Sequence, residues 1–199
     1  MAESTGIPAE VARGISLVIF DVDGVLTDGG AYMGREGAEN ERKKFHLQDG
    51  LGMKLLRAAG MDVVMVSGRV SPATTARAAE LGVECHQDAG ADKLPLVEEL
   101  RRSRGLEWDA VAMLADDLPD AAVFTRVGLP VAVANAVPLI RETALWVTER
   151  VGGDGAAREF CDALLSARGD LLRVVGDYTD RRGGVGLGPA GQRWPRSGE

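Results

Sequence analysis

The sequence predicts an α/β fold in which a parallel β-sheet is covered by helices on both faces. Short apolar runs rich in β-branched residues alternate along the chain with segments of helical periodicity, which is typical of parallel sheets. Several of the helical segments stop at a glycine, a common helix terminator. Several apolar runs end in acidic or hydroxyl residues, and ligands bind beyond the carboxyl ends of such strands.

In the first half of the chain, an apolar run predicts a strand at residues 16–21, and no helical period follows it. Residues 30–46 instead place glycines between two short segments, which predicts a β-hairpin. A helix is predicted at residues 49–59, where Gly60 ends it. The same pattern then predicts a strand, a helix and a strand at residues 62–67, 72–81 and 83–86.

In the second half, further strands are predicted at residues 110–115, 130–133 and 145–148. Helices are predicted at residues 92–104, 118–127, 137–143 and 155–168. The architecture is therefore a three-layer, Rossmann-like domain at residues 15–169, preceded by an N-terminal extension at residues 1–14. Residues 170–199 are rich in Gly, Arg and Pro, and we expect a flexible tail because they bury little apolar surface.

Composition narrows the classes of function. The chain has 199 residues, 45% hydrophobic and 27% charged, and a formal net charge of −7. The acidic balance argues against a nucleic-acid partner, and the chain contains no apolar run of membrane-spanning length. Its two cysteines, Cys85 and Cys161, lie in apolar segments and predict free thiols in a cytoplasmic protein.

The most informative segment lies at the end of the first strand, where Asp21 and Asp23 are followed by Gly24. Alternate residues of a strand point to the same side, so the two carboxylates are expected to lie close together. Neighbouring carboxylates repel each other unless a cation or a shared proton intervenes, and hard oxygen ligands suit Mg²⁺. The simpler interpretation of this segment is a strand followed by an Asx turn.

Three more polar signals occur along the chain: Ser67 and the pair Asp116–Asp117 each follow an apolar run, and Lys93 opens a helical stretch. Each alone has an ordinary explanation, namely a turn, a surface lysine and a helix N-cap. Together they place an acid pair, a hydroxyl, a lysine and a second acid pair at successive strand ends. A receiver domain uses similar groups, but its acid pair and phosphoacceptor lie on different strands, which disagrees with this order.

This order resembles the haloacid dehalogenase (HAD) superfamily of phosphotransferases. The match is closest to the small capless phosphatases that act on 3-deoxy-D-manno-octulosonate 8-phosphate (KDO 8-phosphate), and it covers about Ile15 to Gly169. The matching segments are Asp21–Gly29, Phe45–Gly52, Ser67–Arg69, Asp116–Asp120 and Val151–Glu159. The sequence departs from the family at Ala115, where glycine is usual, and at His46–Gln48, in a loop that faces substrate in relatives.

The resemblance implies a phosphatase that forms an aspartyl-phosphate. Asp21 is then the nucleophile, and Asp23 is the general acid and base. The expected Mg²⁺ ligands are Asp21, the backbone carbonyl of Asp23 and Asp116, with Asp117 either ligating through water or orienting the other ligands.

The same resemblance assigns the substrate contacts. Ser67 and Lys93 are expected to bind the transferring phosphoryl group. The expected substrate-binding residues are Ser67, Gly68, Arg69, Lys93, Asp49 and Gly50. Asp49 can equally serve as an N-cap for the helix that follows it.

The spacing of the motifs leaves no room for a cap domain. In the resembling family a tetramer closes the open site with the hairpin of a neighbouring subunit, so a homo-tetramer is expected here. KDO 8-phosphate is the expected substrate. A nonulosonate 9-phosphate and another biosynthetic sugar phosphate are alternatives, and a non-catalytic oligomerisation module of the same fold is the alternative from a different class.

Overall fold

A six-stranded parallel sheet forms the centre of the protein in the computed structural model, which describes residues 6–34, 37–88 and 92–183. Its strand order is β5-β4-β1-β6-β7-β8. The strands are β1 (Leu17–Asp21), β4 (Asp62–Val66), β5 (Glu84–His86), β6 (Val111–Ala115), β7 (Leu129–Ala132) and β8 (Trp146–Val147). Every residue of β1 and β6 is buried, as their continuous apolar sequences require for strands covered on both faces.

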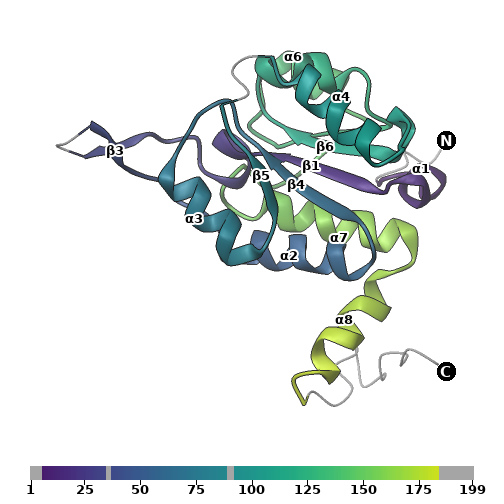
Figure 1. Ribbon diagram of the computed structural model, residues 1–199. Coiled ribbons are helices and arrows are strands. Elements are labelled where there is room, and N and C mark those ends of the chain that lie inside the picture. Colours follow the sequence, from purple (N-terminus) through teal and green to yellow (C-terminus); the bar gives the residue numbers. More distant parts are fainter. Residues whose placement is uncertain (1–5, 35–36, 89–91, 184–199) are drawn as a thin grey trace.

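Helices cover both faces of this sheet (Figure 1). One face carries α2 (Leu47–Ala58), α3 (Pro72–Leu81) and α7 (Ala156–Arg168). The other carries α4 (Leu94–Ser103), α5 (Ala121–Phe124) and α6 (Pro138–Thr143). The chain leaves β1 toward β4 on one side and later returns to β6 on the other side. The carboxyl ends of β1 and β6 therefore border the crevice at the topological switch point of the sheet.

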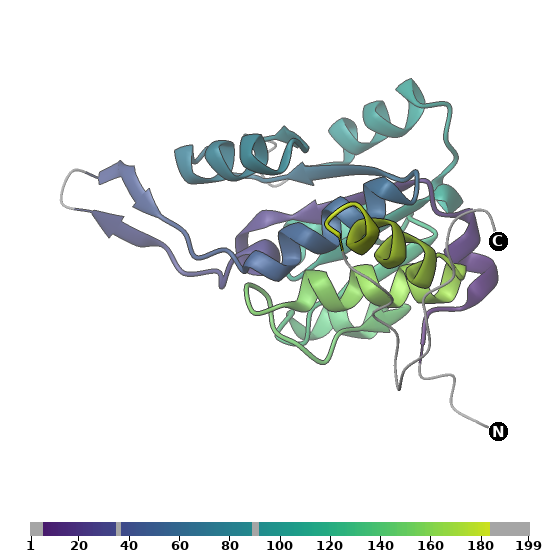
Figure 2. The same cartoon turned by 90° about the horizontal axis from the view of Figure 1, so that it is seen from below.

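A two-stranded antiparallel hairpin, β2 (Tyr32–Gly34) and β3 (Gly37–Arg42), follows β1 and projects from the body of the domain (Figures 1 and 2). Between β1 and the hairpin lies a kinked turn, η1 (Val22–Leu26), in which Asp23 and Gly24 have non-helical backbone angles. The remaining short turns are η2 (Trp108–Ala110) and η3 (Leu118–Asp120). Because the hairpin starts at the carboxyl end of β1, its base lies beside the crevice.

The predicted fold class is confirmed: the sheet is parallel, helices lie on both faces, and the hairpin is separate. Two helices were not predicted. The first, α1 (Ala9–Gly14), lies in the expected N-terminal extension and packs on α7. The second, α8 (Leu171–Asp180), lies in the segment predicted as a flexible tail and packs on α7 and α2. The rest of the predicted tail, residues 184–199, lies outside the described residues.

The spacing of apolar residues explains why α8 is a helix. Leu171, Val174, Val175 and Tyr178 are spaced as one face of a helix, and all four contact or belong to the hydrophobic core. The helix was not predicted because the composition of residues 170–199 as a whole is rich in Gly, Arg and Pro. Within the described ranges, no helix is long and apolar enough to cross a membrane, and both cysteines are free thiols.

Candidate active site

The carboxyl edge of the central strands brings together residues that are far apart in sequence. Asp21 is the last residue of β1, and Asp116 directly follows the adjacent strand β6. Ser67 directly follows β4, on the other side of β1. These strand ends border a pocket of about 400 Å³. It is lined by Asp21, Asp23, Gly68, Arg69, Lys93, Asp116, Asp117, Pro119 and Asp120.

Asp21, Asp116 and Asp120 form an acidic cluster in which one carboxylate oxygen of each lies within 4.8 Å of the others. Burial is the main cause that raises the pKa of all three carboxyl groups. Repulsion between them adds to this effect, so that the pKa of Asp116 reaches about 8 and that of Asp120 about 7. Three crowded oxygen donors that resist joint ionisation fit a hard divalent cation such as Mg²⁺.

This cluster predicts that Mg²⁺ stabilises the fold more at pH 8 than at pH 6. The pKa of Asp116 and of Asp120 rises from 3.8 to about 8 and about 7 in the folded, metal-free protein. Such a raised pKa contributes stability that is fully present below about pH 3.8, falls progressively as the pH rises, and is lost completely once the pH has passed 7 and 8. Bound Mg²⁺ offsets the repulsion that then develops.

Melting temperatures with Mg²⁺ and with a chelator, measured from pH 6 to pH 8, test this expectation. The increment due to Mg²⁺ should grow with pH in the wild type. It should be smaller and less dependent on pH in Asp116→Asn, which removes one ionisable group of the cluster. An increment that is constant or falls toward pH 8 in the wild type would contradict the assignment.

Lys93 lies between two members of the acidic cluster. Its ammonium donates to Asp120 Oδ1 at 2.6 Å and also to Asp21 Oδ1, and its side chain is 3% exposed. Burial alone would lower the pKa of Lys93, but the two carboxylates outweigh burial and the pKa is raised. Lys93 is therefore a buried cation, fixed at the N-terminal end of α4 and directed at Asp21.

Close backbone packing determines the shape of the site. Gly24 has φ +97°, and a Cβ atom there would lie 2.0 Å from Asp116 Oδ2. On the other side of η1, a Cβ atom on Gly152 would lie 1.7 Å from the Gly24 carbonyl oxygen. Any other residue at these positions would displace η1 or the Asp116 carboxylate. The two glycines thus let the turn after β1 fit between the acidic cluster and the loop before α7.

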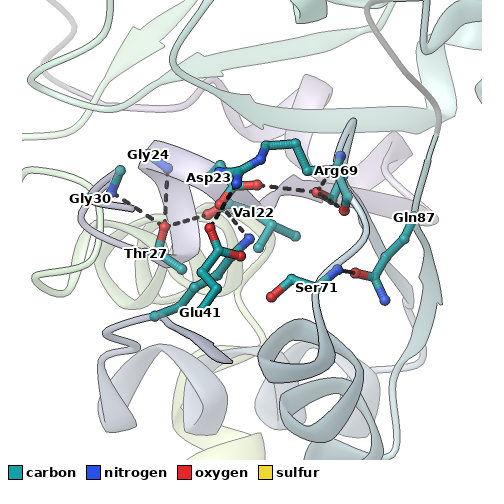
Figure 3. A network of polar contacts seen from close by, with 12 residues as sticks. Val22, Asp23, Gly24, Thr27, Gly30, Glu41, Arg69, Ser71 and Gln87 are labelled. Atoms are coloured by element: carbon teal, nitrogen blue, oxygen red, sulfur yellow. Dashed lines mark hydrogen bonds and ion pairs between the residues drawn. The ribbon is translucent and has the colours of Figure 1, made fainter. Parts of the chain in front are cut away.

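Asp23 lies in η1 and is outside the acidic cluster. Its Oδ1 accepts a hydrogen bond from Lys43 Nζ at 2.5 Å, and its Oδ2 lies 3.2 Å from the Ser67 hydroxyl. Thr27 supports the turn, because its hydroxyl donates to the Val22 carbonyl and accepts from the Gly24 amide. Figure 3 shows Asp23 at the centre of this polar network.

Arg69 lies at the edge of the pocket. One guanidinium nitrogen donates to Glu41 Oε1 of β3 at 2.7 Å, and the arginine side chain remains 51% exposed. Its backbone is tied to Ser67, whose hydroxyl accepts from the Arg69 amide at 3.1 Å. A guanidinium held in this way can meet an anionic group of a ligand.

Of three other predicted site residues, Asp117 lines the main pocket, whereas Asp49 and Gly50 lie elsewhere. Asp117 is exposed at the pocket wall, and its carboxylate caps η3 by accepting from the Leu118 amide at 2.7 Å. Asp49 and Gly50 do not line the main pocket. They border a separate cavity of about 10 Å³, where Asp49 accepts from the Arg158 amide at 2.8 Å. Burial raises the pKa of Asp49.

Three polar residues of the site were not selected from the sequence: Asp120, Lys43 and Glu41. Asp120 is the third acid of the segment Asp116–Asp120, which already carried the family resemblance. That third acid was a usable signal. Glu41 lies in β3, and Lys43 lies two residues further on, just beyond the end of that strand. Which face of a hairpin meets the domain depends on tertiary packing, which the sequence pattern does not reveal.

No protein-family model matches the chain. The 3-deoxy-D-manno-octulosonate 8-phosphate phosphatase KdsC of Yersinia pestis is 41% identical over 165 residues, which cover 83% of this chain and 87% of that protein. KdsC of Escherichia coli K12 has the same identity and coverage.

Solved structures agree with this relationship. A HAD superfamily (subfamily III A) hydrolase from Legionella pneumophila has a TM-score of 0.82 and 41% identity, covering 86% of this chain and 93% of that one. The KDO 8-phosphate phosphatase of Moraxella catarrhalis, in complex with magnesium, phosphate and KDO, has a TM-score of 0.81 and 33% identity, covering 85% and 97%.

The resemblance drawn from the motifs is therefore confirmed over most of the chain. The acidic strand ends, the buried lysine and the uncapped sheet occur in a sequence that shares two fifths of its aligned residues with KdsC proteins. This chain belongs to the KDO 8-phosphate phosphatase family of the haloacid dehalogenase superfamily.

Proposed function

We propose that the protein is a Mg²⁺-dependent phosphatase that hydrolyses KDO 8-phosphate to KDO and inorganic phosphate through an aspartyl-phosphate on Asp21. One observation carries this proposal. The Asp21 carboxylate lines the pocket at the end of β1, paired with Lys93 and within an acidic cluster that can hold a cation. A nucleophile, a cation site and a fixed positive charge are the groups that phosphoryl transfer requires.

The acidic cluster supplies the metal ligands in this proposal. Asp21 and Asp116 would hold Mg²⁺, with a further oxygen from Asp120 or from the backbone of Asp23. When bound, Mg²⁺ neutralises the repulsion between the carboxylate and the phosphate dianion. Asp117 caps η3, so its proposed role is to orient the loop that carries Asp116.

The residues of the chain then perform two transfers. A carboxylate oxygen of Asp21 attacks phosphorus, and the bond from phosphorus to the sugar oxygen breaks. Lys93 and the Ser67 hydroxyl stabilise the phosphoryl oxygens, and Asp23 gives a proton to the departing oxygen. Asp23 next takes a proton from water, whose oxygen attacks phosphorus and releases Asp21.

The substrate assignment rests on the named activity of the relatives and on local charge. The protein has a net charge of −7, so a sugar acid needs a positive group near the pocket. Arg69 is available for this purpose, because half of its side chain remains exposed while Glu41 holds it in place. A nonulosonate 9-phosphate carries the same carboxylate and phosphate and is the main competing substrate.

Release of inorganic phosphate from a panel of sugar phosphates tests the proposal. We expect the highest kcat/KM with KDO 8-phosphate, complete loss of activity after exhaustive chelation, and recovery with Mg²⁺. A preference for a nonulosonate 9-phosphate or another sugar phosphate would overturn the substrate assignment alone. Activity that survives chelation would overturn the metal assignment. A Mg²⁺-loaded protein that hydrolyses nothing in the panel would support the non-catalytic module instead.

We also propose that the protein is a homo-tetramer in which the hairpin borders the pocket of a neighbouring subunit. The side chains of Tyr32 and Met33 on β2 are 51% and 58% exposed, although both have large apolar surfaces. The hairpin projects away from its own domain, so these side chains are available to another subunit (Figure 2).

The double variant Tyr32→Ser/Met33→Ser is expected to sediment as a smaller species and to lose sugar-phosphate turnover. Leu145→Ser is the matched control, because Leu145 is 48% exposed but lies before β8. Sedimentation velocity at the assay concentration measures the assembly. A wild type that is fully active as a monomer would contradict the proposal.

A further inference from the structure

The hairpin makes two buried polar contacts with the candidate active site of its own chain. Glu41 and Lys43 are two residues apart, and their side chains are 2% and 1% exposed. Glu41 pairs with Arg69 at 2.7 Å, and Lys43 pairs with Asp23 at 2.5 Å. Alternate residues of an extended chain share a face, so this face of the hairpin base is directed at the pocket.

We propose that Lys43 is a positioning residue for Asp23, on the assumption that Asp23 is the general acid and base of the proposed phosphatase. The ammonium of Lys43 occupies Asp23 Oδ1. The other oxygen, Oδ2, lies 3.2 Å from the Ser67 hydroxyl and remains the one that can exchange a proton with the leaving group and then with water. Lys43 thereby determines which carboxylate oxygen of Asp23 exchanges the proton.

Burial makes the ion pair between Lys43 and Asp23 necessary. An ammonium with a 1% exposed side chain is costly without a counterion, and Asp23 is the acidic partner that the described structure gives it. Asp23 in turn has few other restraints. Its side chain is 26% exposed, and the Ser67 hydroxyl that faces it can donate instead to the Arg69 carbonyl at 2.9 Å. Without Lys43, the carboxylate of Asp23 would be free to rotate.

The leaving group provides a test that a purely structural role would not pass. A sugar alkoxide needs a proton as it departs, whereas p-nitrophenolate is a stable anion and departs without one. The value of kcat/KM reports the first transfer, up to formation of the aspartyl-phosphate. Misplacing Asp23 should therefore lower kcat/KM for a sugar phosphate much more than for p-nitrophenyl phosphate.

The experiment compares Lys43→Met with Lys43→Arg and with Lys44→Met, using KDO 8-phosphate and p-nitrophenyl phosphate. Lys44 is the adjacent, exposed lysine, so its replacement removes the same charge without touching Asp23. We expect Lys43→Met to lose about 10- to 100-fold in kcat/KM with the sugar phosphate and less than about threefold with the aryl phosphate. Lys43→Arg should recover part of the loss, and Lys44→Met should match the wild type on both substrates.

Melting curves identify any variant that fails to fold, and in that case Lys43→Arg, which keeps the charge, must show the same dependence on the leaving group. Equal losses on both substrates, or no loss in Lys43→Met, would overturn the role of Lys43 while an active wild type upholds the proposed function. A wild type that hydrolyses neither substrate would overturn both proposals.

Discussion

Replacement of Asp21 by asparagine is expected to lower turnover by at least about 10⁴-fold, which corresponds to more than about 5 kcal/mol in the activation free energy. The amide has no ionised oxygen to attack phosphorus, and it removes one of the three carboxylates that can hold Mg²⁺. The fold should survive, because Lys93 keeps its ion pair with Asp120 and because the Asp21 carboxylate is itself disfavoured by burial.

Phosphate release in saturating Mg²⁺ measures this effect, and thermal melting checks the fold. Asp62→Asn is the matched control. Asp62 is the first residue of β4, at the end of that strand away from the pocket, and it pairs with Arg104 on the surface. That variant should keep wild-type turnover. Turnover of Asp21→Asn within about tenfold of wild type, a change of only about 1.4 kcal/mol, would exclude Asp21 as the nucleophile.

The sheet and its covering helices were predictable because strand burial and helix stops are local signals. The strand segments 17–20 and 111–115 are apolar on both faces, and Gly82 and Gly169 end helices in the left-handed conformation. The missed helices had weaker local signals. α1 has only six residues and no side-chain N-cap, and α8 lies beside a segment whose composition is typical of a flexible tail.

The site residues, too, were predictable only where local sequence signals place them. Asp21, Ser67 and Asp116 follow strands, so the topology alone brings them to one edge. The contacts of Asp23 were not predictable, because the chain leaves the strand after Asp21 and η1 turns that carboxylate toward Lys43 and Ser67.

The substrate role of Asp49 stays a prediction, and its packing explains why the motif alone does not decide it. The motif matched a loop that contacts substrate in relatives. Within this chain, however, Asp49 is buried against the start of α7, and Gly50 packs beside Arg77. The match in sequence was real, but the direction of the side chain depends on how α2 and α7 pack together.

Lys93→Met is expected to lower kcat by about 10²- to 10³-fold and to move the acidic limb of the pH–rate profile to higher pH. The Lys93 ammonium favours the ionised form of Asp21, against the burial that raises the pKa of that carboxyl group. Without the cation, the pKa of Asp21 rises further. At a given pH a larger fraction of the nucleophile is then protonated, so raising the pH should restore part of the lost rate.

The control for this charge is Lys54→Met, because Lys54 is exposed on α2 and is absent from the pocket lining. It should keep both the rate and the profile of the wild type. The pH–rate profiles of kcat at saturating Mg²⁺ and substrate separate two roles of Lys93. If kcat falls and the acidic limb does not move, Lys93 acts on the phosphoryl oxygens alone. If kcat does not fall, the buried pair of Lys93 and Asp21 contributes to the fold and not to catalysis, and the proposed arrangement of nucleophile and cation is wrong.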